Sequence, residues 1–276
     1  MTKPAAITAK IREITSSANP LLKVFRHALA EGVTREGLLA IEGPFLLEEA
    51  LRAGERATVH SVLVAASAVD KFSARLARVP KEAEVAQVTD RLFERVAQTE
   101  TPQGIAALVE LRPGELEAVL TRENPLLLVA CGLQDPGNLG TIMRSARALG
   151  AAALITMKDT VSPFNPKAVR ASAGALFHLP IFSNQETGSL FKKLRGAGVR
   201  IVAADRRSPS SLAQTDLRGA VAILVGREAA GLSAEIARQA DLRLSIPIHP
   251  DTDSVNAATA ASIFLYEAAR QRGFRY

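Results

Sequence analysis

The stretch LLLVACGLQDPGNLGTIMRSARALGAAALITM, residues 126–157, decides the fold of the C-terminal half of the chain. It opens on a short apolar run at Leu126, passes through a polar turn into a helical pattern from Gly140, and ends on a second apolar run at Ala152. Short apolar runs of this kind predict strands that are buried on both faces. A helix between two such strands predicts that the strands are parallel neighbours in one sheet.

The same alternation continues to the C-terminus. Further buried strands are predicted in RIVAAD at Arg200, AVAILVG at Ala220 and LRLSIPI at Leu242. Helices are predicted in PKAVRASAGAL, TGSLFKKLRGAG and the segment from Ala257 onward, which has an apolar stripe. The sequence therefore predicts an α/β fold, with a parallel sheet flanked by helices.

The first 111 residues follow a different pattern. NPLLKVFRHALAEG, EGPFLLEEALRAG and RLFERVAQTE have helical spacing, and HSVLVAAS reads as a strand. The polar, turn-rich segment RPGELEAVLTRENP begins at Arg112 and separates the two halves. We therefore predict a smaller N-terminal α/β domain over residues 1–111, a linker over residues 112–124 and a C-terminal domain over residues 125–276.

The composition describes a basic chain with a substantial core. Of the 276 residues, 47% are hydrophobic, and 34 Lys and Arg against 28 Asp and Glu give a formal net charge of +6. Arginine outnumbers lysine, and its planar guanidinium suits phosphate, so the charge favours an RNA or DNA partner. With no Trp and two Tyr, the sequence does not favour a platform that stacks single-stranded bases.

The sequence does not favour secretion or a membrane partner. No apolar run approaches the roughly 20 residues that span a bilayer, and the first residues, MTKPAAITAKIREITSS, lack the apolar region of a signal peptide. The single cysteine, Cys131, cannot form an intramolecular disulfide, which is typical of a reducing compartment. We expect a cytoplasmic protein, and we interpret Cys131 as a small buried hydrophobe rather than a nucleophile.

Several common functional motifs are absent from the sequence. No GxGxxG follows a predicted strand, no GxxxxGK[ST] phosphate loop occurs, and the four histidines do not have the spacing of metal ligands. These absences argue against a dinucleotide-dependent oxidoreductase, a phosphate-loop NTPase and a zinc hydrolase. We expect no metal site.

Polar loops follow three of the predicted strands. They are GLQDPGNLG at residues 132–140, LVGREAAGLS at residues 224–233 and IPIHPDTDSVNAA at residues 246–258. Ligands of parallel sheets bind beyond the carboxyl ends of the strands, so we expect the three loops to share one site. At the end of the third loop, Asp253, Ser254 and Asn256 also suit the cap of the following helix, and the residues alone leave both interpretations open.

Together, these loops resemble the three signature motifs of the SpoU/TrmH family, the RNA ribose 2′-O-methyltransferases of the SPOUT class. The match lies in DPGNLGTIMRSARALGA, LVGREAAGLS and IPIHPDTDSVNAATAASIFLYE, with NPKAVRASAGALFHLPI between the first two. The upstream half resembles the RNA substrate-binding domain of the family through ITSSANPLLK, LLAIEGPFLLEEAL and TPQGIAALV. The resemblance spans nearly the whole chain.

The resemblance implies a fold, a cofactor and a set of site residues. It implies a deep trefoil knot in the C-terminal domain, a homodimer, and an RNA substrate, with ribosomal RNA favoured over transfer RNA. It implies S-adenosyl-L-methionine as cofactor, held by backbone groups of Gly226, Ile246 and Val255. The catalytic residues that it implies are Asn138, Arg144, Glu228, Ser254 and Asn256.

The resemblance leaves the chemical role of Arg144 open. A ribose hydroxyl is a poor nucleophile until its proton leaves, and the family arginine is sometimes described as the general base. With an ordinary arginine pKa of about 12.5 to 13.8, a neutral side chain at pH 7 costs roughly 7 to 9 kcal/mol. The alternative is a cationic Arg144 that grips an RNA phosphate and stabilises the developing alkoxide, while phosphate or water accepts the proton.

Some residues depart from the family pattern or have weaker support. Ala229 and Pro250 stand where glycine is common, and Val255 stands where leucine is usual. The first two changes give slight support to the alternative of a non-catalytic RNA-binding protein, and the intact catalytic residues argue against it. A transfer-RNA enzyme or an antibiotic-resistance enzyme would share the proposed chemistry. Further candidates for RNA contacts, which are also ordinary surface residues by type, are Arg147, Arg170 and His249.

Overall fold

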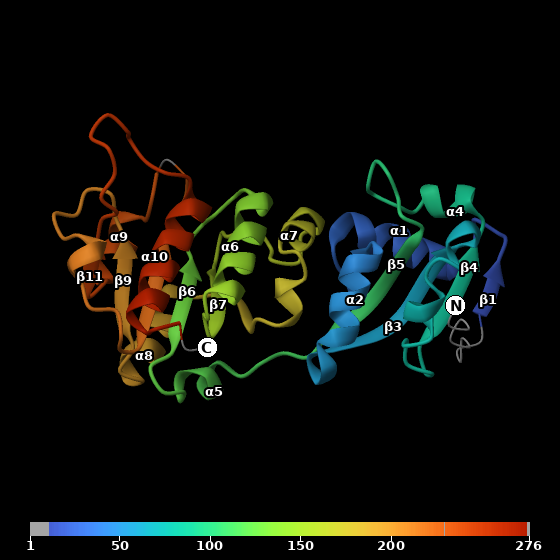
Figure 1. Cartoon of the computed structure of the whole chain (residues 1–276), viewed down its shortest axis with the longest axis horizontal. Coiled ribbons are helices and arrows are strands. Elements are labelled where there is room, and N and C mark those ends of the chain that lie inside the picture. The colour runs from blue at the N-terminus through green and yellow to red at the C-terminus, as the bar shows by residue number, and fades with distance from the viewer. Residues whose placement is uncertain (1–10, 229, 275–276) are drawn as a thin grey trace. The chain divides into compact units, whose positions relative to one another are not determined.

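The computed structural model describes residues 11–228 and 230–274, which form two compact units (Figure 1). Unit 1 comprises residues 11–112 together with residues 164–177. Unit 2 comprises residues 113–163 and the described residues from 178 onward. The chain therefore passes between the units at three points, and a short segment from the C-terminal half folds as part of unit 1.

Unit 1 contains a mixed five-stranded sheet in the order β1-β4-β3-β5-β2. β1, β4 and β3 are parallel, whereas β5 is antiparallel to both β3 and β2. The strand bounds are β1 (Ile11–Ile14), β2 (Leu39–Glu42), β3 (Ala57–Ala65), β4 (Glu84–Val88) and β5 (Ile105–Leu111). The helices are α1 (Pro20–Glu31), α2 (Pro44–Arg52), α3 (Ser73–Leu76), α4 (Asp90–Glu94) and α7 (Pro166–Ala171).

The predicted helices α1 and α2 are confirmed, and their sequences explain where they start. The side chain of Asn19 accepts a hydrogen bond from the Leu21 amide, and Pro20 occupies the first turn of α1, where no amide hydrogen is needed. The helix predicted in RLFERVAQTE is confirmed only over α4, because the chain turns after Glu94 and the buried carboxylate of Glu42 accepts a hydrogen bond from the Gln98 amide.

Unit 2 contains a six-stranded sheet in the order β11-β9-β10-β6-β7-β8, and every pair in it is parallel. The strands are β6 (Leu126–Ala130), β7 (Ala153–Met157), β8 (Ile181–Gln185), β9 (Arg200–Ala204), β10 (Val221–Val225) and β11 (Leu242–Leu244). All residues of the central strands β6 and β10 are buried. The predicted parallel α/β sheet is therefore confirmed.

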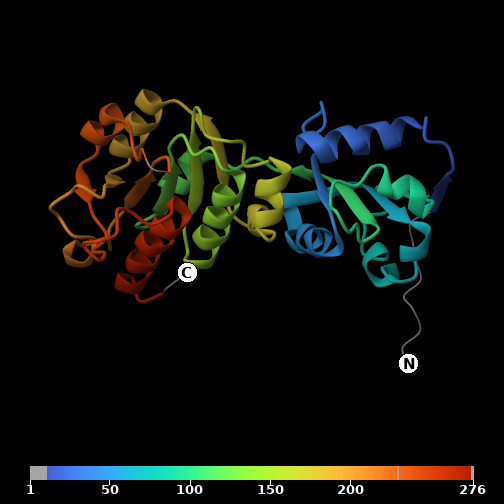
Figure 2. The same ribbon diagram turned by 90° about the horizontal axis from the view of Figure 1, so that it is seen from above.

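Helices cover both faces of this sheet. In Figure 2, α6 (Pro136–Ala148) and α10 (Ala257–Gln271) lie side by side on one face, where the Ser262 hydroxyl donates a hydrogen bond to the Ser145 hydroxyl at 2.7 Å. The opposite face packs against α5 (Leu116–Leu120), α8 (Thr187–Gly196) and α9 (Ala234–Gln239) in one apolar cluster. This arrangement leaves the carboxyl ends of the strands free to carry loops.

Three details differ from the sequence-based expectation. The run predicted as a buried strand from Leu242 forms only the short edge strand β11, in which Arg243 is exposed. The edge strand β8 was not predicted, because its partly exposed residues lack an apolar run. The helix predicted from Pro166 ends at Ala171, because Ala173 and Gly174 adopt positive φ angles of 47° and 79°.

The segment predicted as a linker, residues 112–124, contains α5, whose Leu116, Val119 and Leu120 are buried in the core of unit 2. Residues 164–177, which the predicted boundaries assign to the C-terminal domain, belong to unit 1. Each segment therefore belongs to the unit against which its side chains pack. Among the described residues, no helix has the length and apolar character needed to cross a membrane.

The loop that follows β9, residues 205–215, runs beside the chain that leaves β11. The Asp205 amide donates a hydrogen bond to the carbonyl of Leu244, and the Ser245 amide donates one to the carbonyl of Ser210, both at 2.9 Å. These bonds bring two loops that are distant in sequence to the same edge of the sheet.

Candidate active site

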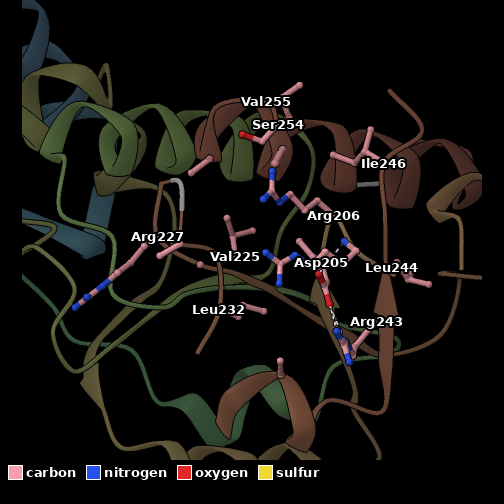
Figure 3. Close-up of a pocket in the computed structure, with 18 of the residues that line it drawn as sticks. Asp205, Arg206, Val225, Arg227, Leu232, Arg243, Leu244, Ile246, Ser254 and Val255 are labelled. Carbon is pink, nitrogen blue, oxygen red and sulfur yellow. Dashed lines mark hydrogen bonds and ion pairs between the residues drawn. The ribbon is translucent and has the colours of Figure 1, made fainter. Parts of the chain in front are cut away.

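A cavity of about 350 Å³ lies at the carboxyl ends of β9, β10 and β11 (Figure 3). Its wall is formed by the residues that follow these strands, by the first turns of α9 and α10, and by the loop in front of α10. Parallel strands place their carboxyl ends at one edge of a sheet, so loops from distant parts of the chain meet there. The second and third polar loops of the sequence therefore share one cavity.

Gly226 shapes the floor of this cavity. It follows β10 directly, and a Cβ atom at this position would fall inside the backbone of Gly231 and Leu232. The loop closes on itself through paired backbone hydrogen bonds between Arg227 and Gly231, at 3.0 and 2.9 Å. Only glycine allows this close approach of two backbone segments.

Apolar side chains form much of the wall, namely Val225, Leu232, Leu244, Ile246 and Phe264. A flat apolar ring can be covered by such side chains, while the backbone amides and carbonyls of the surrounding loops offer hydrogen bonds to its edge. The cavity thus has the character of a small-molecule site.

A chain of hydrogen bonds joins the three polar loops beside the cavity. The Asn138 side-chain amide donates to the Glu228 carboxylate at 2.8 Å, and the Asn256 side-chain amide donates to the Asn138 side-chain oxygen at 3.0 Å. Asn138 lies in the first turn of α6, which is capped by Asp135. These hydrogen bonds place one carboxylate and two amides from three separate loops next to one another. The three side chains, Asn138, Glu228 and Asn256, are called the polar chain below.

Asn256 also answers the question that the sequence left open. Its side-chain oxygen accepts hydrogen bonds from the amides of Ala258 and Thr259 at 2.8 and 3.3 Å and caps α10. Its side-chain amide group, in contrast to the oxygen, donates a hydrogen bond to Asn138. One side chain therefore both caps the helix and belongs to the polar chain beside the cavity.

Charged groups line the side of the cavity next to β9. Asp205, whose side chain is only 17% exposed, forms an ion pair with Arg243 and accepts a hydrogen bond from the Arg207 amide at 3.0 Å. Burial acts to raise the pKa of Asp205, but these hydrogen bonds outweigh it and hold the pKa below its usual range. Asp205 is therefore a carboxylate at neutral pH.

The structure places the predicted residues as follows. Five of them line the cavity: Gly226, Glu228, Ile246, Ser254 and Val255. Asn138 and Asn256 do not line it but are linked to Glu228 by hydrogen bonds. The Arg144 side chain is exposed on α6, does not line the cavity, and forms no hydrogen bond or ion pair with another described residue. The roles predicted for these residues stay predictions.

The weaker candidates lie on the surface. Arg147 is exposed on α6, and Arg170 is exposed at the end of α7, in unit 1. His249 is exposed and lies 3.6 Å from the Asp251 carboxylate. Of the positions that depart from the family pattern, Pro250 is an exposed turn residue, whereas Ala229 lies outside the described residues.

Sequence reasoning missed a fourth group of residues at the cavity. The segment that follows β9 contributes Asp205, Arg206 and Arg207 to the wall, and β11 contributes Arg243. The signal was present, because the polar sequence DRRSPSS follows a predicted strand and so meets the same rule that selected the other loops.

Cys131 lies at the end of β6, next to this edge of the sheet, but it is buried in the core. Burial raises the pKa of its thiol to about 12, because the thiolate would lack solvation there. A thiol in this state is not a nucleophile at neutral pH. The interpretation of Cys131 as a small buried hydrophobe is confirmed.

Comparison with known proteins identifies the family. Residues 125–266 match the model of the SpoU rRNA Methylase family, which covers more than half of the chain. The chain belongs to the SpoU rRNA methylase family. Residues 33–107 of this family member match the model of an MRM3-like substrate binding domain. The resemblance inferred from the three sequence motifs is thus confirmed.

Relatives of this SpoU family member span three quarters of the chain or nearly all of it. A 23S rRNA guanosine 2′-O-methyltransferase of Bacillus subtilis is 30% identical, covering 93% of this chain and 98% of its own. A 23S rRNA uridine 2′-O-methyltransferase of Streptomyces viridochromogenes is 33% identical, over 74% of this chain and 73% of its own. The structure of an AdoMet-bound rRNA methyltransferase from Sinorhizobium meliloti superimposes with a TM-score of 0.81 and 31% identity, over 94% and 98% of the two chains.

Proposed function

We propose that this chain is an S-adenosylmethionine-dependent methyltransferase that methylates the 2′-hydroxyl of a ribose in ribosomal RNA. The observation that carries the proposal is the cavity with its partly apolar wall next to the Asn138, Glu228 and Asn256 side chains, in a SpoU family member. The cavity of about 350 Å³ lies within the range of roughly 300 to 1,000 Å³ for small-molecule sites. Relatives that are 33% and 30% identical are named 23S rRNA 2′-O-methyltransferases.

The residues present fit the cofactor. The backbone of Gly226, Ile246 and Val255 would hold its adenosine part, since these residues line the cavity among apolar side chains. When bound, S-adenosylmethionine supplies a methyl group that the positive charge of its sulfonium already activates. The protein therefore has to position the ribose hydroxyl and help its proton to leave.

The polar chain beside the cavity would position the substrate. Asn138 is held between Glu228 and Asn256, so its orientation is determined before RNA binds. Glu228 and Ser254 line the cavity. The Glu228 carboxylate can accept a hydrogen bond from a ribose hydroxyl, and the Ser254 hydroxyl can donate or accept one. We assign Arg144 to the RNA side of the reaction, where an exposed guanidinium can bind a phosphate and stabilise the developing alkoxide.

We also propose that the C-terminal domain contains the deep trefoil knot of its family. The hydrogen bonds between the loop at residues 205–215 and the chain after β11 support this, as do bonds between α10 and the chain before β10. In the latter, the Leu217 amide donates to the Gln271 side chain at 2.7 Å. An experimental structure traced through residues 200–274 tests the proposal, and an unthreaded chain would contradict it.

We propose that unit 1 selects the RNA site and that the protein works in the cytoplasm as a homodimer. The match of residues 33–107 to a substrate binding domain supports the first statement. The small residues Ala257, Ala258 and Ala261 of α10 are not available for a dimer contact, because they are buried and α10 packs against α6 of the same chain. Exposed Tyr266 and Phe274 offer an apolar contact instead. A monomer mass at all concentrations in sedimentation would exclude the dimer.

Methyl transfer is tested with labelled S-adenosylmethionine and ribosomal RNA, followed by mapping of the modified nucleotide. We expect label on a ribose of 23S rRNA, and label on transfer RNA alone would move the substrate to that class. Calorimetry with the cofactor separates an enzyme from a non-catalytic RNA-binding protein, because only the enzyme needs to bind it.

The role of Arg144 is tested by comparing Arg144→Lys with Arg144→Ala in the same assay. A purely cationic role predicts partial rescue by lysine, which retains the charge but not the planar fork. Unchanged turnover in the alanine variant would remove Arg144 from the mechanism.

A further inference from the structure

The cavity carries more positive than negative groups. Four guanidinium groups and two carboxylates line it, those of Arg206, Arg207, Arg227, Arg243, Asp205 and Glu228. A wall with surplus positive charge favours a ligand that brings a negative group to it. The hydrogen bonds and ion pairs of each arginine show which of them can bind such a group.

Two of the four arginines are already engaged. Arg243 is paired with Asp205, and its Nε lies 2.7 Å from the carboxylate. The Arg227 side chain points away from the other labelled residues in Figure 3, and its Nε donates to the carbonyl of Gly132 at 3.1 Å. The two carboxylates are engaged as well, Asp205 by Arg243 and Glu228 by Asn138.

Arg206 and Arg207 have donors to spare. Both are exposed and lie in the loop after β9, separated from the strand by Asp205. Arg206 uses one Nη1 hydrogen bond, at 3.0 Å, to the carbonyl of Asp253, and a guanidinium has five N–H donors in total. The guanidinium of Arg207 has no hydrogen bond or ion pair to any residue in the described part of the chain. Only its backbone amide is held, by Asp205.

We propose that Arg206 and Arg207 form an oxyanion-binding subsite in the wall of the cavity, which takes a carboxylate or phosphate group of a bound ligand. The planar fork of arginine binds both groups in a bidentate way. The bond from Arg206 to Asp253 also joins this subsite to the loop that carries Ser254 and Val255. A ligand that bridges the two arginines would hold the loops after β9 and β11 together.

The subsite rests on the proposed function, which offers two ligands with such a group. S-adenosylmethionine carries one carboxylate besides its sulfonium and ammonium groups, so a cavity with surplus positive charge accepts it best with the carboxylate at free arginines. The carboxylate of Glu228 lies on the side of the polar chain, where a sulfonium is favoured instead. The second ligand is RNA, through a backbone phosphate.

Calorimetry on the full chain tests the subsite. The ligands are S-adenosylmethionine, its decarboxylated analogue and a ribosomal RNA fragment at several salt concentrations. The decisive variant is Arg207→Ala, because the removed guanidinium has no hydrogen bond or ion pair within the described residues and acts only through its charge on the Asp205 carboxylate. Arg206→Ala is measured beside it. The matched control is Arg238→Ala, which removes an exposed arginine of α9 that does not line the cavity.

A carboxylate ligand predicts that Arg207→Ala raises the Kd of S-adenosylmethionine about tenfold, or about 1.4 kcal/mol, and leaves that of the decarboxylated analogue unchanged. If the bound group is an RNA phosphate, we expect an unchanged Kd for the cofactor and weaker RNA binding. The slope of log K for RNA against log salt concentration should fall by about one for each arginine removed. In both cases Arg238→Ala behaves as the original chain.

The subsite is wrong if Arg206→Ala and Arg207→Ala both bind cofactor and RNA as the original chain does. This outcome leaves the proposed function intact, because the original chain still binds both ligands. If the original chain binds neither ligand, the proposed function fails and the subsite fails with it. The two failures are therefore distinguishable in one set of titrations.

Discussion

Gly226 shows how much of the site depends on a single missing side chain. The loop after β10 folds back so closely that the backbone of Gly231 and Leu232 occupies the space of a Cβ atom at this position. The obstacle is backbone rather than the flexible end of a side chain, so it cannot move aside without opening the loop. The shape of the cavity floor is thus determined at one residue.

We predict that Gly226→Ala opens this loop and weakens S-adenosylmethionine binding by about tenfold or more, since one tenfold step corresponds to only about 1.4 kcal/mol. Calorimetry measures the affinity, and thermal unfolding reports the accompanying loss of stability. The control is Gly196→Ala at the end of α8, where no atom lies within 4 Å of the added methyl group. Equal affinity of Gly226→Ala and the original chain would contradict the structural role of the glycine.

At the scale of elements, the start of α10 carries two functions in one side chain. The oxygen of Asn256 caps the helix, while its amide group donates to Asn138. Capping stabilises α10, whereas the bond to Asn138 orders the polar chain beside the cavity. The two functions use different atoms, so substitution can separate them.

We predict that Asn256→Asp retains the stability of the fold, because a carboxylate oxygen caps as well as an amide oxygen, but lowers turnover about tenfold, equivalent to about 1.4 kcal/mol of activation free energy. Asn256→Ala loses both functions, and its free energy of unfolding falls by about 0.5 to 2 kcal/mol. Urea unfolding and single-turnover methylation measure the two effects. Equal turnover of Asn256→Asp and the original chain would show that the bond to Asn138 has no catalytic role.

Helix α2 is tied to its surroundings by the carboxylate of Glu48. It forms ion pairs with Arg52 one turn along the helix, with Arg75 of α3 and with Arg78. The hydrogen bond from Arg78 lowers the pKa of Glu48 and outweighs the opposing effect of burial. Because the pKa is lower in the folded than in the unfolded state, the group stabilises the fold above its unfolded pKa and loses this effect as the pH falls through the folded value.

We predict that Glu48→Gln lowers the free energy of unfolding at about pH 7 by up to about 1 kcal/mol and lowers the Tm accordingly. The difference from the wild-type protein disappears near pH 3. Calorimetric melts across this pH range measure it. The control is Glu55→Gln, since the Glu55 side chain is 94% exposed and its carboxylate forms only a long ion pair, at 3.7 Å to Arg112, among the described residues. A difference that grows as the pH falls would contradict the assignment.

In the molecule as a whole, the end of α10 is hydrogen-bonded to separate segments of unit 2. The Arg272 guanidinium donates to the carbonyls of Asn124, Leu217 and Gly219, at 2.6 to 3.1 Å. The side chain is half-buried, which lowers its pKa. These carbonyls lie just before β6 and β10, so one side chain ties the last helix to the start of both central strands.

We predict that Arg272→Ala lowers the free energy of unfolding by about 1 to 3 kcal/mol, because it leaves these carbonyls without their donor. Arg270→Ala is the control, since it removes only an exposed ion pair with Glu267 and costs about 0.5 kcal/mol. Urea unfolding followed by circular dichroism measures both. Equal losses in the two variants would show that Arg272 does not fasten these segments.

The sequence by itself determined the class of the fold and the loops that form the site. The apolar runs at Leu126, Ala152, Arg200 and Ala220 are strands of a parallel sheet, because strands covered by helices on both faces need apolar residues at every position. The rule that ligands bind beyond the carboxyl ends of such strands selected the loops that now line the cavity or border it.

Which side chains meet and which stay free depends on contacts that form only when the chain folds. The edge strand β8, the packing of α5 into the core of unit 2 and the assignment of residues 164–177 to unit 1 depend on contacts between distant segments, which local periodicity does not encode. The same holds for Arg206 and Arg207. Their sequence resembles any basic turn, and their spare donors become visible only once Arg243 is seen to occupy Asp205. Pairing in space, unlike the alternation of apolar residues, is a property of the folded chain.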